Sequence, residues 1–232
     1  MYVKNNILYF EPFDYLKKKK ITARSFVELV GLNHFKKPGD ALLSIFSVVR
    51  ESVDPKWLRR GDFAENLVTA IYKRDGHNPV HYHPDDVGYD LFKNDPFFGG
   101  VIDIELPDEE TLIEVKSKDL KNYNLIVSNP PQEEIFQGMF YAYKKHYRTF
   151  KMVWIFFDPE TQEEIFDNKK PTTLKNLKKI ENVYTVDYEK MSSLMDKART
   201  MVNDFSVSRK IPLDQISPAL LEKLKPRISR YE

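Results

Sequence analysis

Five stretches of the chain are predicted to be helices. They have apolar side chains at helical spacing, or residues that are typical of the start and end of a helix. The clearest begins at Asp54 and Pro55, an N-cap residue followed by proline at the first helical position, and it stops before Gly76. In the first stretch, Thr22 is the expected N-cap. The predicted helices cover residues 21–31, about 40–51, 54–74, 129–146 and 189–205.

Alternating or continuous apolar segments predict strands at residues 79–83, 97–106, 111–116, 153–157 and 183–188. The run at 153–157 is apolar throughout, which is typical of a central strand covered on both faces. The order of helices and strands predicts an α/β fold with a mixed central sheet flanked by helices. We expect a single domain over residues 1–232, in which the residues after about 206 form a loosely packed tail or arm.

Composition excludes several classes of protein. The chain of 232 residues has 36 Lys and Arg against 35 Asp and Glu, so contact with phosphates must come from local basic patches. There is no cysteine, which excludes disulfides and cysteine-bound zinc or iron–sulfur centres. No apolar run is long enough to span a membrane, and the first residues lack the pattern of a signal peptide. We therefore expect a cytoplasmic protein that does not bind membranes.

The strongest chemical signal is on the predicted strand at 111–116. Side chains alternate across a strand, so Glu114 and Lys116 share one face. The carboxylate suits a hard cation, and the lysine suits the positioning or deprotonation of an attacking water. An ordinary ion pair on a strand would give the same two residues.

Two further acids join this pair. Asp103 lies on the preceding predicted strand, and the short turn at 107–110 would bring it beside Glu114. Two acids on one face of paired strands are costly unless a cation lies between them. Glu65 falls within an apolar stripe of the helix at 54–74, one turn after Gly61. Solvent exposure of Asp103, or a salt bridge from Glu65 to a nearby arginine, remains the simpler alternative for each.

Gln137 and Tyr141 are four residues apart, so they share one face of the helix at 129–146. An amide and a phenol can both hydrogen-bond to a phosphate or to the catalytic groups. His81 and His83 alternate on a predicted strand and could form a metal pair, but no third ligand has suitable spacing. We interpret these histidines as structural or as residues at the edge of a substrate site.

The order of these motifs resembles the PD-(D/E)XK nuclease superfamily. The chain has a helix with Gly-x-x-x-Glu, a strand with Asp, a strand with Glu-x-Lys and a helix with Gln-x-x-x-Tyr. It is similar to the RecB-type and YqaJ-like branch, which includes the lambda exonuclease-like enzymes. The segment at 21–25, Ile-Thr-Ala-Arg-Ser, also resembles the helix start at which such enzymes meet DNA-end phosphates.

The resemblance implies a restriction-endonuclease-like core and a role for each matching residue. Glu65, Asp103, Glu114 and the carbonyl of Val115 would bind Mg²⁺, for which Mn²⁺ can substitute. Lys116 would orient the attacking water, while Gln137 and Tyr141 would brace the site. No iron–sulfur cluster is implied. The residues expected to contact DNA are Thr22, Arg24, Ser25, Arg59 and Arg60.

The expected function is that of a metal-dependent exonuclease acting on linear double-stranded DNA in recombination or repair, of the kind that phages encode. Arg24 stands where the family has serine, with Ser25 one position later, which leaves the polarity open. The relatives imply a homo-oligomer and a single-strand annealing or single-strand-binding protein as partner. An endonuclease of restriction or anti-phage type on the same core, or a non-catalytic DNA-binding module, stays open as an alternative.

Overall fold

The protein is described here by a computed structural model that covers residues 1–10, 18–49, 53–171, 174 and 176–230. Its contacts divide the chain into two compact units. The first unit comprises Met1–Glu51, Phe92–Gly99 and Glu189–Glu232, and the second comprises Ser52–Leu91 and Gly100–Tyr188. The segments of the two units interleave along the chain. The single domain over residues 1–232 stays a prediction.

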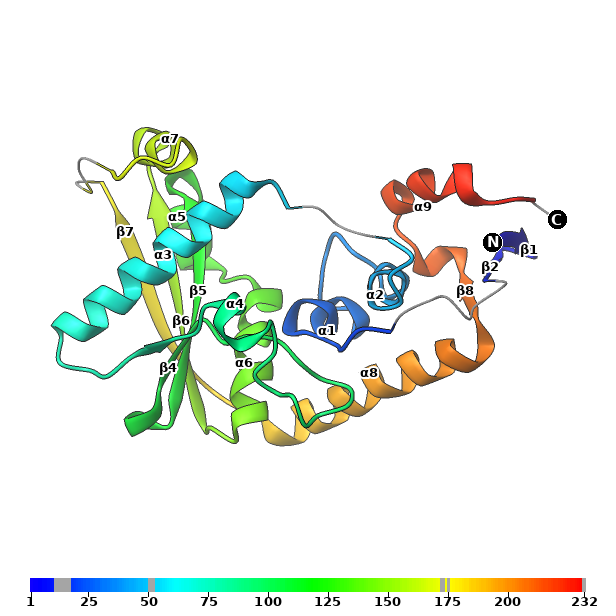
Figure 1. Ribbon diagram of the computed structural model, residues 1–232, viewed down its shortest axis with the longest axis horizontal. Coiled ribbons are helices and arrows are strands. Elements are labelled where there is room, and N and C mark those ends of the chain that lie inside the picture. Colours follow the sequence, from blue (N-terminus) through cyan, green and yellow to red (C-terminus); the bar gives the residue numbers. More distant parts are fainter. Residues whose placement is uncertain (11–17, 50–52, 172–173, 175, 231–232) are drawn as a thin grey trace. The chain divides into compact units, whose positions relative to one another are not determined.

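The second unit contains a mixed five-stranded sheet in the order β3-β4-β5-β6-β7 (Figure 1). Strands β5 and β6 are parallel, and the other neighbours are antiparallel, as expected for a mixed sheet. The continuous apolar run lies in β6, which has a strand on each side and buries every residue from 152 to 157. The strands are β3 (Val80–His81), β4 (Ile104–Leu106), β5 (Thr111–Asp119), β6 (Thr149–Phe157) and β7 (Lys178–Thr185).

Two long helices flank this sheet, and both were predicted. Helix α3 (Pro55–Arg74) packs Ala64 and Val68 in one apolar core with Ile113 and Val115 of β5. Because side chains alternate along β5, Glu114 and Lys116 point to the opposite face, which α6 (Gln132–Lys145) covers. The unit also contains α4 (Pro84–Val87), α5 (Tyr123–Ser128) and α7 (Pro159–Phe166), none of which was predicted.

The alternating segment at 97–106 was wrongly predicted as one strand. Only Ile104–Leu106 forms β4, and Phe98 instead bridges to Ile21 within the first unit. The alternation there reflects the burial of Phe98, Ile102 and Ile104, of which only Ile104 lies in β4. The strand expected at 79–83 is likewise reduced to two residues, because Pro84 starts a short helix. The last predicted strand is displaced, since β7 ends at Thr185 and helix α8 has begun by Tyr188.

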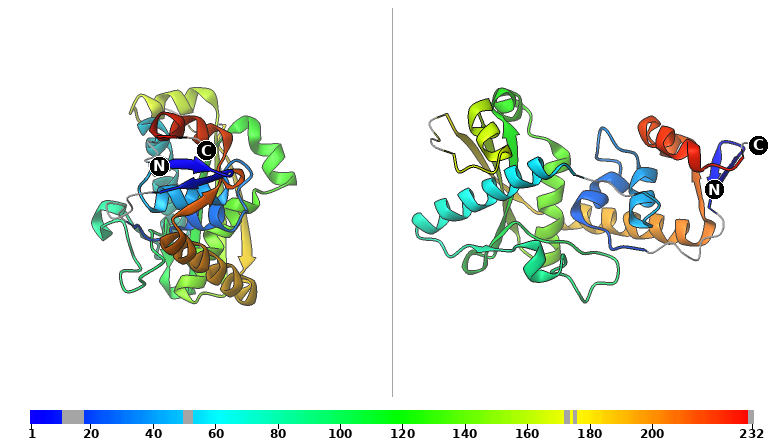
Figure 2. Two further views of the ribbon diagram at one scale, coloured as in Figure 1. Left: turned by 90° about the vertical axis from the view of Figure 1, so that its right-hand side faces the viewer. Right: turned by 45° about the horizontal axis from the view of Figure 1, so that its top comes forward.

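The first unit has a three-stranded antiparallel sheet in the order β1-β2-β8, in which strands from the two ends of the chain pair (Figure 2). Thr22 caps α1 as predicted, and Gly31 follows that helix with a φ of +81°. Helix α2 ends at Ile45, earlier than predicted, since Ser47 is left-handed; residues 50 and 51 of that prediction lie outside the described residues. The elements are β1 (Tyr2–Lys4), β2 (Ile7–Tyr9), α1 (Ala23–Leu29), α2 (Pro38–Ile45), α8 (Tyr188–Ser208), β8 (Lys210–Pro212) and α9 (Pro218–Leu224).

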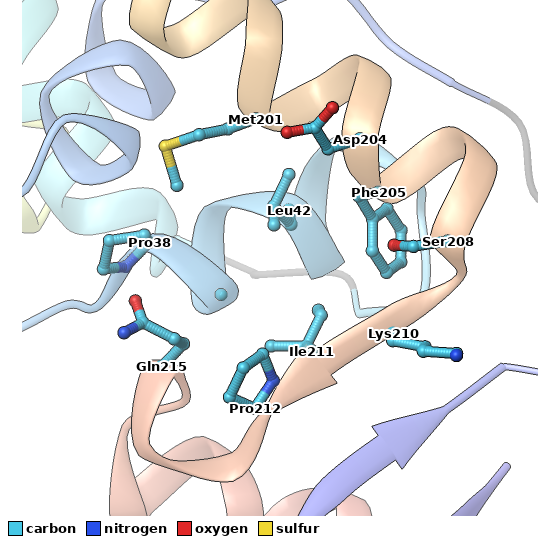
Figure 3. A pocket seen from close by; sticks show the side chains of 11 residues that line it. Pro38, Leu42, Met201, Asp204, Phe205, Ser208, Lys210, Ile211, Pro212 and Gln215 are labelled. Carbon is cyan, nitrogen blue, oxygen red and sulfur yellow. The ribbon is translucent and has the colours of Figure 1, made fainter.

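The residues after 206 do not form the loose tail that the sequence predicted. They contain β8 and α9, and Ile211, Ile216 and Leu224 are buried. The Ser217 N–H donates to the buried Asp40 carboxylate over 2.9 Å. Figure 3 shows β8 lining a cavity of about 300 Å³ together with α2 and α8. The local sequence does not reveal this packing, because the partners of β8 and Ser217 lie more than 150 residues away in the sequence.

Within the described part of the chain, no helix has the length and apolar character needed to cross a bilayer.

Candidate active site

Strand β5 brings three of the predicted site residues into direct contact. The Lys116 ammonium donates to Glu114 Oε1 over 2.6 Å and to Gln137 Oε1 of α6 over 3.0 Å. The Glu114 residue is only 3% exposed, so this is a buried ion pair with an amide fixing the lysine. The alternation of strand side chains and the position of α6 against β5 produce this arrangement.

Asp103 lies directly before β4, where the pairing of β4 with β5 ends. Ile104 pairs with Ile113, so the antiparallel register places Asp103 opposite Glu114. Asp103 Oδ2 accepts the backbone N–H of Val115 over 2.8 Å, beyond the last backbone pair of the two strands. The N–H and C=O of one strand residue point to the same edge, so the Val115 carbonyl lies on the Asp103 side of β5.

Glu65 reaches the same region from helix α3. Its carboxylate contacts His81 of β3, with 3.0 Å between Oε2 and Nε2. From the sequence, His81 and His83 were interpreted alike, as structural or as residues at the edge of a substrate site. The structure separates them, because His81 contacts Glu65 whereas His83 lies 3.8 Å from Asp85.

The three acids perturb one another. Burial is the main cause that raises the pKa of Glu65, Asp103 and Glu114 to about 7 each. The next causes include the neighbouring charges, with Glu114 acting on Glu65, Glu65 on Asp103 and Asp103 on Glu114. Burial opposes the charge on Lys116, but Glu114 and Asp103 outweigh it and raise the lysine pKa. The structure thus brings the four predicted residues into one electrostatic cluster.

Tyr141 is packed against the backbone just before Asp103. It lies one turn after Gln137 on α6 and is 7% exposed. A Cβ atom added to Gly100 would lie 2.5 Å from Tyr141 Oη, and Gly100 has a φ of +127°. Gly100 is therefore the residue that allows the tyrosine to approach this segment so closely.

The carboxylate and carbonyl groups of this cluster are of the chemical type that binds a hard cation. Glu114 Oε2 is buried and has no hydrogen-bond partner among the described residues, although a buried carboxylate oxygen normally has one. One oxygen of Asp103 accepts the Val115 N–H, and one oxygen of Glu65 contacts His81 Nε2. Carboxylate and carbonyl oxygens are the ligands that Mg²⁺ and Mn²⁺ prefer. The described side chains do not, however, form a closed group of three or more acidic or histidine donors around one point.

The predicted DNA contacts of α3 have structural partners in the second unit. Arg60 is 9% exposed, donates to Asp119 Oδ1 over 2.6 Å and to the Ser117 carbonyl over 3.1 Å, and stacks over Trp57. Arg59 donates to the Phe166 carbonyl. Both guanidinium groups thus tie α3 to neighbouring elements, and a DNA contact of either residue stays a prediction.

The other predicted DNA contacts lie in the first unit. The backbone N–H of Thr22 donates to Ser25 Oγ over 2.8 Å, and the two residues form the capping box of α1. Arg24 lies 3.4 Å from Glu28, with 56% of its side chain exposed. Thr22 and Ser25 therefore have a structural role at the start of α1, and a phosphate contact of the three residues stays a prediction.

Comparisons with known proteins give the fold. No protein-family model matches the chain. An alkaline exonuclease (LHK-Exo) from Laribacter hongkongensis matches with a TM-score of 0.56 and 13% identity, over 90% of this chain and 92% of that one. A phage-related exonuclease from Haemophilus somnus 129PT matches with a TM-score of 0.54 and 12% identity, over 89% and 97%. The chain shares their fold. This exonuclease-like fold is the one that the resemblance to the YqaJ-like branch predicted.

Two further comparisons add detail. A structure of LHK-Exo in complex with dAMP matches with a TM-score of 0.51 and 16% identity, over 90% of this chain and 92% of that one. In sequence, 92 residues are 29% identical to the uncharacterized protein MG373 of Mycoplasma genitalium, which is 39% of this chain. That match spans 33% of the length of the relative. The fold is therefore shared at low sequence identity.

Proposed function

We propose that this chain is a metal-dependent nuclease that hydrolyses phosphodiester bonds of DNA, acting as an exonuclease on linear duplexes. The observation that carries the proposal is the buried Glu114 carboxylate. One of its oxygens is bound by Lys116 and the other has no partner among the described residues. A buried acid in this state, beside a second acid in Asp103, calls for a cation.

Glu114, Asp103 and Glu65, with the carbonyl of Val115, would hold Mg²⁺ or Mn²⁺. When bound, the cation supplies Lewis-acid stabilisation of charge on the scissile phosphate and lowers the pKa of water. The raised pKa of each carboxylate means that binding the cation displaces protons from these acids near pH 7.

Lys116 acts as a charged donor in this proposal. Its raised pKa keeps it protonated at neutral pH, so it orients the attacking water and balances negative charge instead of accepting a proton. Gln137 holds the ammonium from α6 and restricts its position. Tyr141, against Gly100, fixes the segment that carries Asp103.

The choice of an exonuclease rests on the solved proteins that share the fold. Two are named as exonucleases, and one of them was solved with dAMP, a nucleoside monophosphate. We propose that the substrate of this chain is DNA, and that the chain acts in recombination or repair. A homo-oligomer and a partner that binds or anneals single strands belong to the same proposal.

The test is digestion of end-labelled linear duplex and of closed circular DNA, with Mg²⁺ or with EDTA. We expect degradation of the linear form alone, abolished by EDTA. Lys116→Ala should lower the rate by about 10²–10³-fold, because it removes a preorganised positive charge. The matched control is Lys151→Ala. Lys151 lies on β6 of the same sheet, its side chain is 18% exposed against 22% for Lys116, and it pairs with Glu109 over 3.7 Å.

Three results would contradict the proposal. Full activity of the Lys116→Ala variant would show that the cluster is not the catalytic centre. Degradation of closed circles at the rate of the linear duplex would make the protein an endonuclease. An inactive but folded wild-type protein would favour a non-catalytic DNA-binding module.

A further inference from the structure

The Glu65 carboxylate is held by one neighbour, His81. The contact joins Glu65 Oε2 and His81 Nε2 over 3.0 Å, and the two side chains are 22% and 18% exposed. The described residues offer no second hydrogen-bond partner to this carboxylate. The Thr69 hydroxyl donates to the backbone carbonyl of Glu65 instead.

Strand β3 places His81 with respect to the rest of the site. His81 pairs with Ile104 of β4, and the next N–H, that of Tyr82, donates to the Asp103 carbonyl over 3.3 Å. The same pair of strands therefore positions His81 and Asp103 together. The imidazole of His81 is thus carried by a two-residue strand that pairs with β4.

Glu65 needs such a restraint. A glutamate on a helix has three rotatable side-chain bonds, and fixing them costs conformational entropy. Glu114 and Asp103 are restrained by Lys116 and by the Val115 N–H. In metal sites, hydrogen bonds to the ligating carboxylates fix their orientation.

We propose that His81 is a positioning residue, whose Nε2–H holds one oxygen of Glu65 and so leaves the other oxygen to bind the divalent cation. This inference rests on the proposed function, since it assigns His81 a role toward the same cation. Glu65 is ionised when it binds the cation, and an ionised carboxylate accepts hydrogen bonds only, so the hydrogen of this contact is then on the imidazole. His81 itself does not touch the substrate or the cation in this account.

Titration of the metal-free, full-length protein with MnCl₂ by isothermal calorimetry tests the inference without any assay of activity. His81→Ala should weaken Mn²⁺ binding by about tenfold, which is the lower end of the effect of such hydrogen bonds. His81→Gln should restore most of the loss, because the amide NH₂ of Gln can occupy the place of Nε2 and donate. In a Glu65→Gln background, His81→Ala should have no further effect.

His83→Ala is the matched control. His83 is two residues away and 53% of its side chain is exposed, beside Asp85. It should bind Mn²⁺ as the wild type does. Circular dichroism of every variant verifies the fold.

Three results would overturn the inference alone: wild-type affinity in His81→Ala, no recovery in His81→Gln, or an undiminished effect of His81→Ala in the Glu65→Gln background. The absence of Mn²⁺ binding by the folded wild-type protein would overturn the metal-dependent function as well. The two failures are therefore distinguishable in one series of titrations.

Discussion

Gly100→Ala provides a sharp test of the packing around the site. The added Cβ would lie 2.5 Å from Tyr141 Oη, 3.2 Å from its Cε1 and 3.3 Å from its Cζ. Tyr141 is 7% exposed, so its ring cannot swing into solvent. The φ of +127° at residue 100 is a second obstacle, because a residue with a Cβ is strained in that region.

The two costs can be estimated separately. The backbone strain is about 1–3 kcal/mol, and forcing an additional methyl group into a packed site costs about 1–3 kcal/mol. We therefore expect the free energy of unfolding to fall by roughly 2–6 kcal/mol. Urea denaturation followed by circular dichroism measures this fall.

Two companion variants separate the causes. Adding Tyr141→Phe to Gly100→Ala removes the atom at 2.5 Å and leaves ring carbons at 3.2 and 3.3 Å, so part of the steric loss should return. Gly61→Ala is the control for the substitution itself. Gly61 lies within α3, and its Cβ would meet nothing within 4 Å, so this variant should gain about 0.5–1 kcal/mol.

An unchanged unfolding midpoint for Gly100→Ala would show that neither the backbone strain nor the steric clash is present. If Tyr141→Phe restores none of the lost stability, the whole loss comes from the backbone at residue 100, and the close approach of the tyrosine has no energetic consequence.

Two further predictions concern charge. Because the pKa of Glu65, Asp103 and Glu114 is raised to about 7 from 4.5, 3.8 and 4.5, these acids stabilise the metal-free fold most below pH 4 and lose that contribution as the pH rises through 7. Between pH 5 and 8 the melting temperature should therefore fall more steeply with pH than that of a variant with amides in place of all three acids. Equal slopes of melting temperature against pH would contradict this. Glu105→Ala should cost about 3 kcal/mol in urea denaturation, because the buried Glu105 accepts hydrogen bonds from two tyrosines and Lys145, and a loss under 1 kcal/mol would contradict it.

Much of the second unit could be predicted from local sequence. The cap at Asp54 and the proline after it fix the start of α3, and the apolar run at 153–157 identifies the central strand. The alternation of Glu114 and Lys116 on β5 requires only that the segment be extended. Each of these features depends on residues that are close in the sequence, so the local pattern of apolar and polar residues is enough to predict it.

The rest depends on contacts between distant residues. Strand β8 pairs with β2 about 200 residues earlier, and each is three residues long, too short for a periodic signal. His81 belongs to the site because β3 pairs with β4 and α3 brings Glu65 to it, which no spacing within 79–83 reveals. The segment around Phe98 was wrongly predicted as part of a strand. Phe98 is buried at a position that continues the alternation, but it bridges to Ile21 in the first unit.

The proposed function requires Glu114, Asp103 and the Val115 carbonyl to converge on one divalent cation, together with Glu65. Anomalous diffraction at the manganese edge, from crystals of the full-length protein grown with MnCl₂, locates this cation. We expect an anomalous peak within about 2–2.5 Å of an oxygen of Glu114 and one of Asp103. A peak at another place, or none at a saturating concentration of Mn²⁺, would rule out this site.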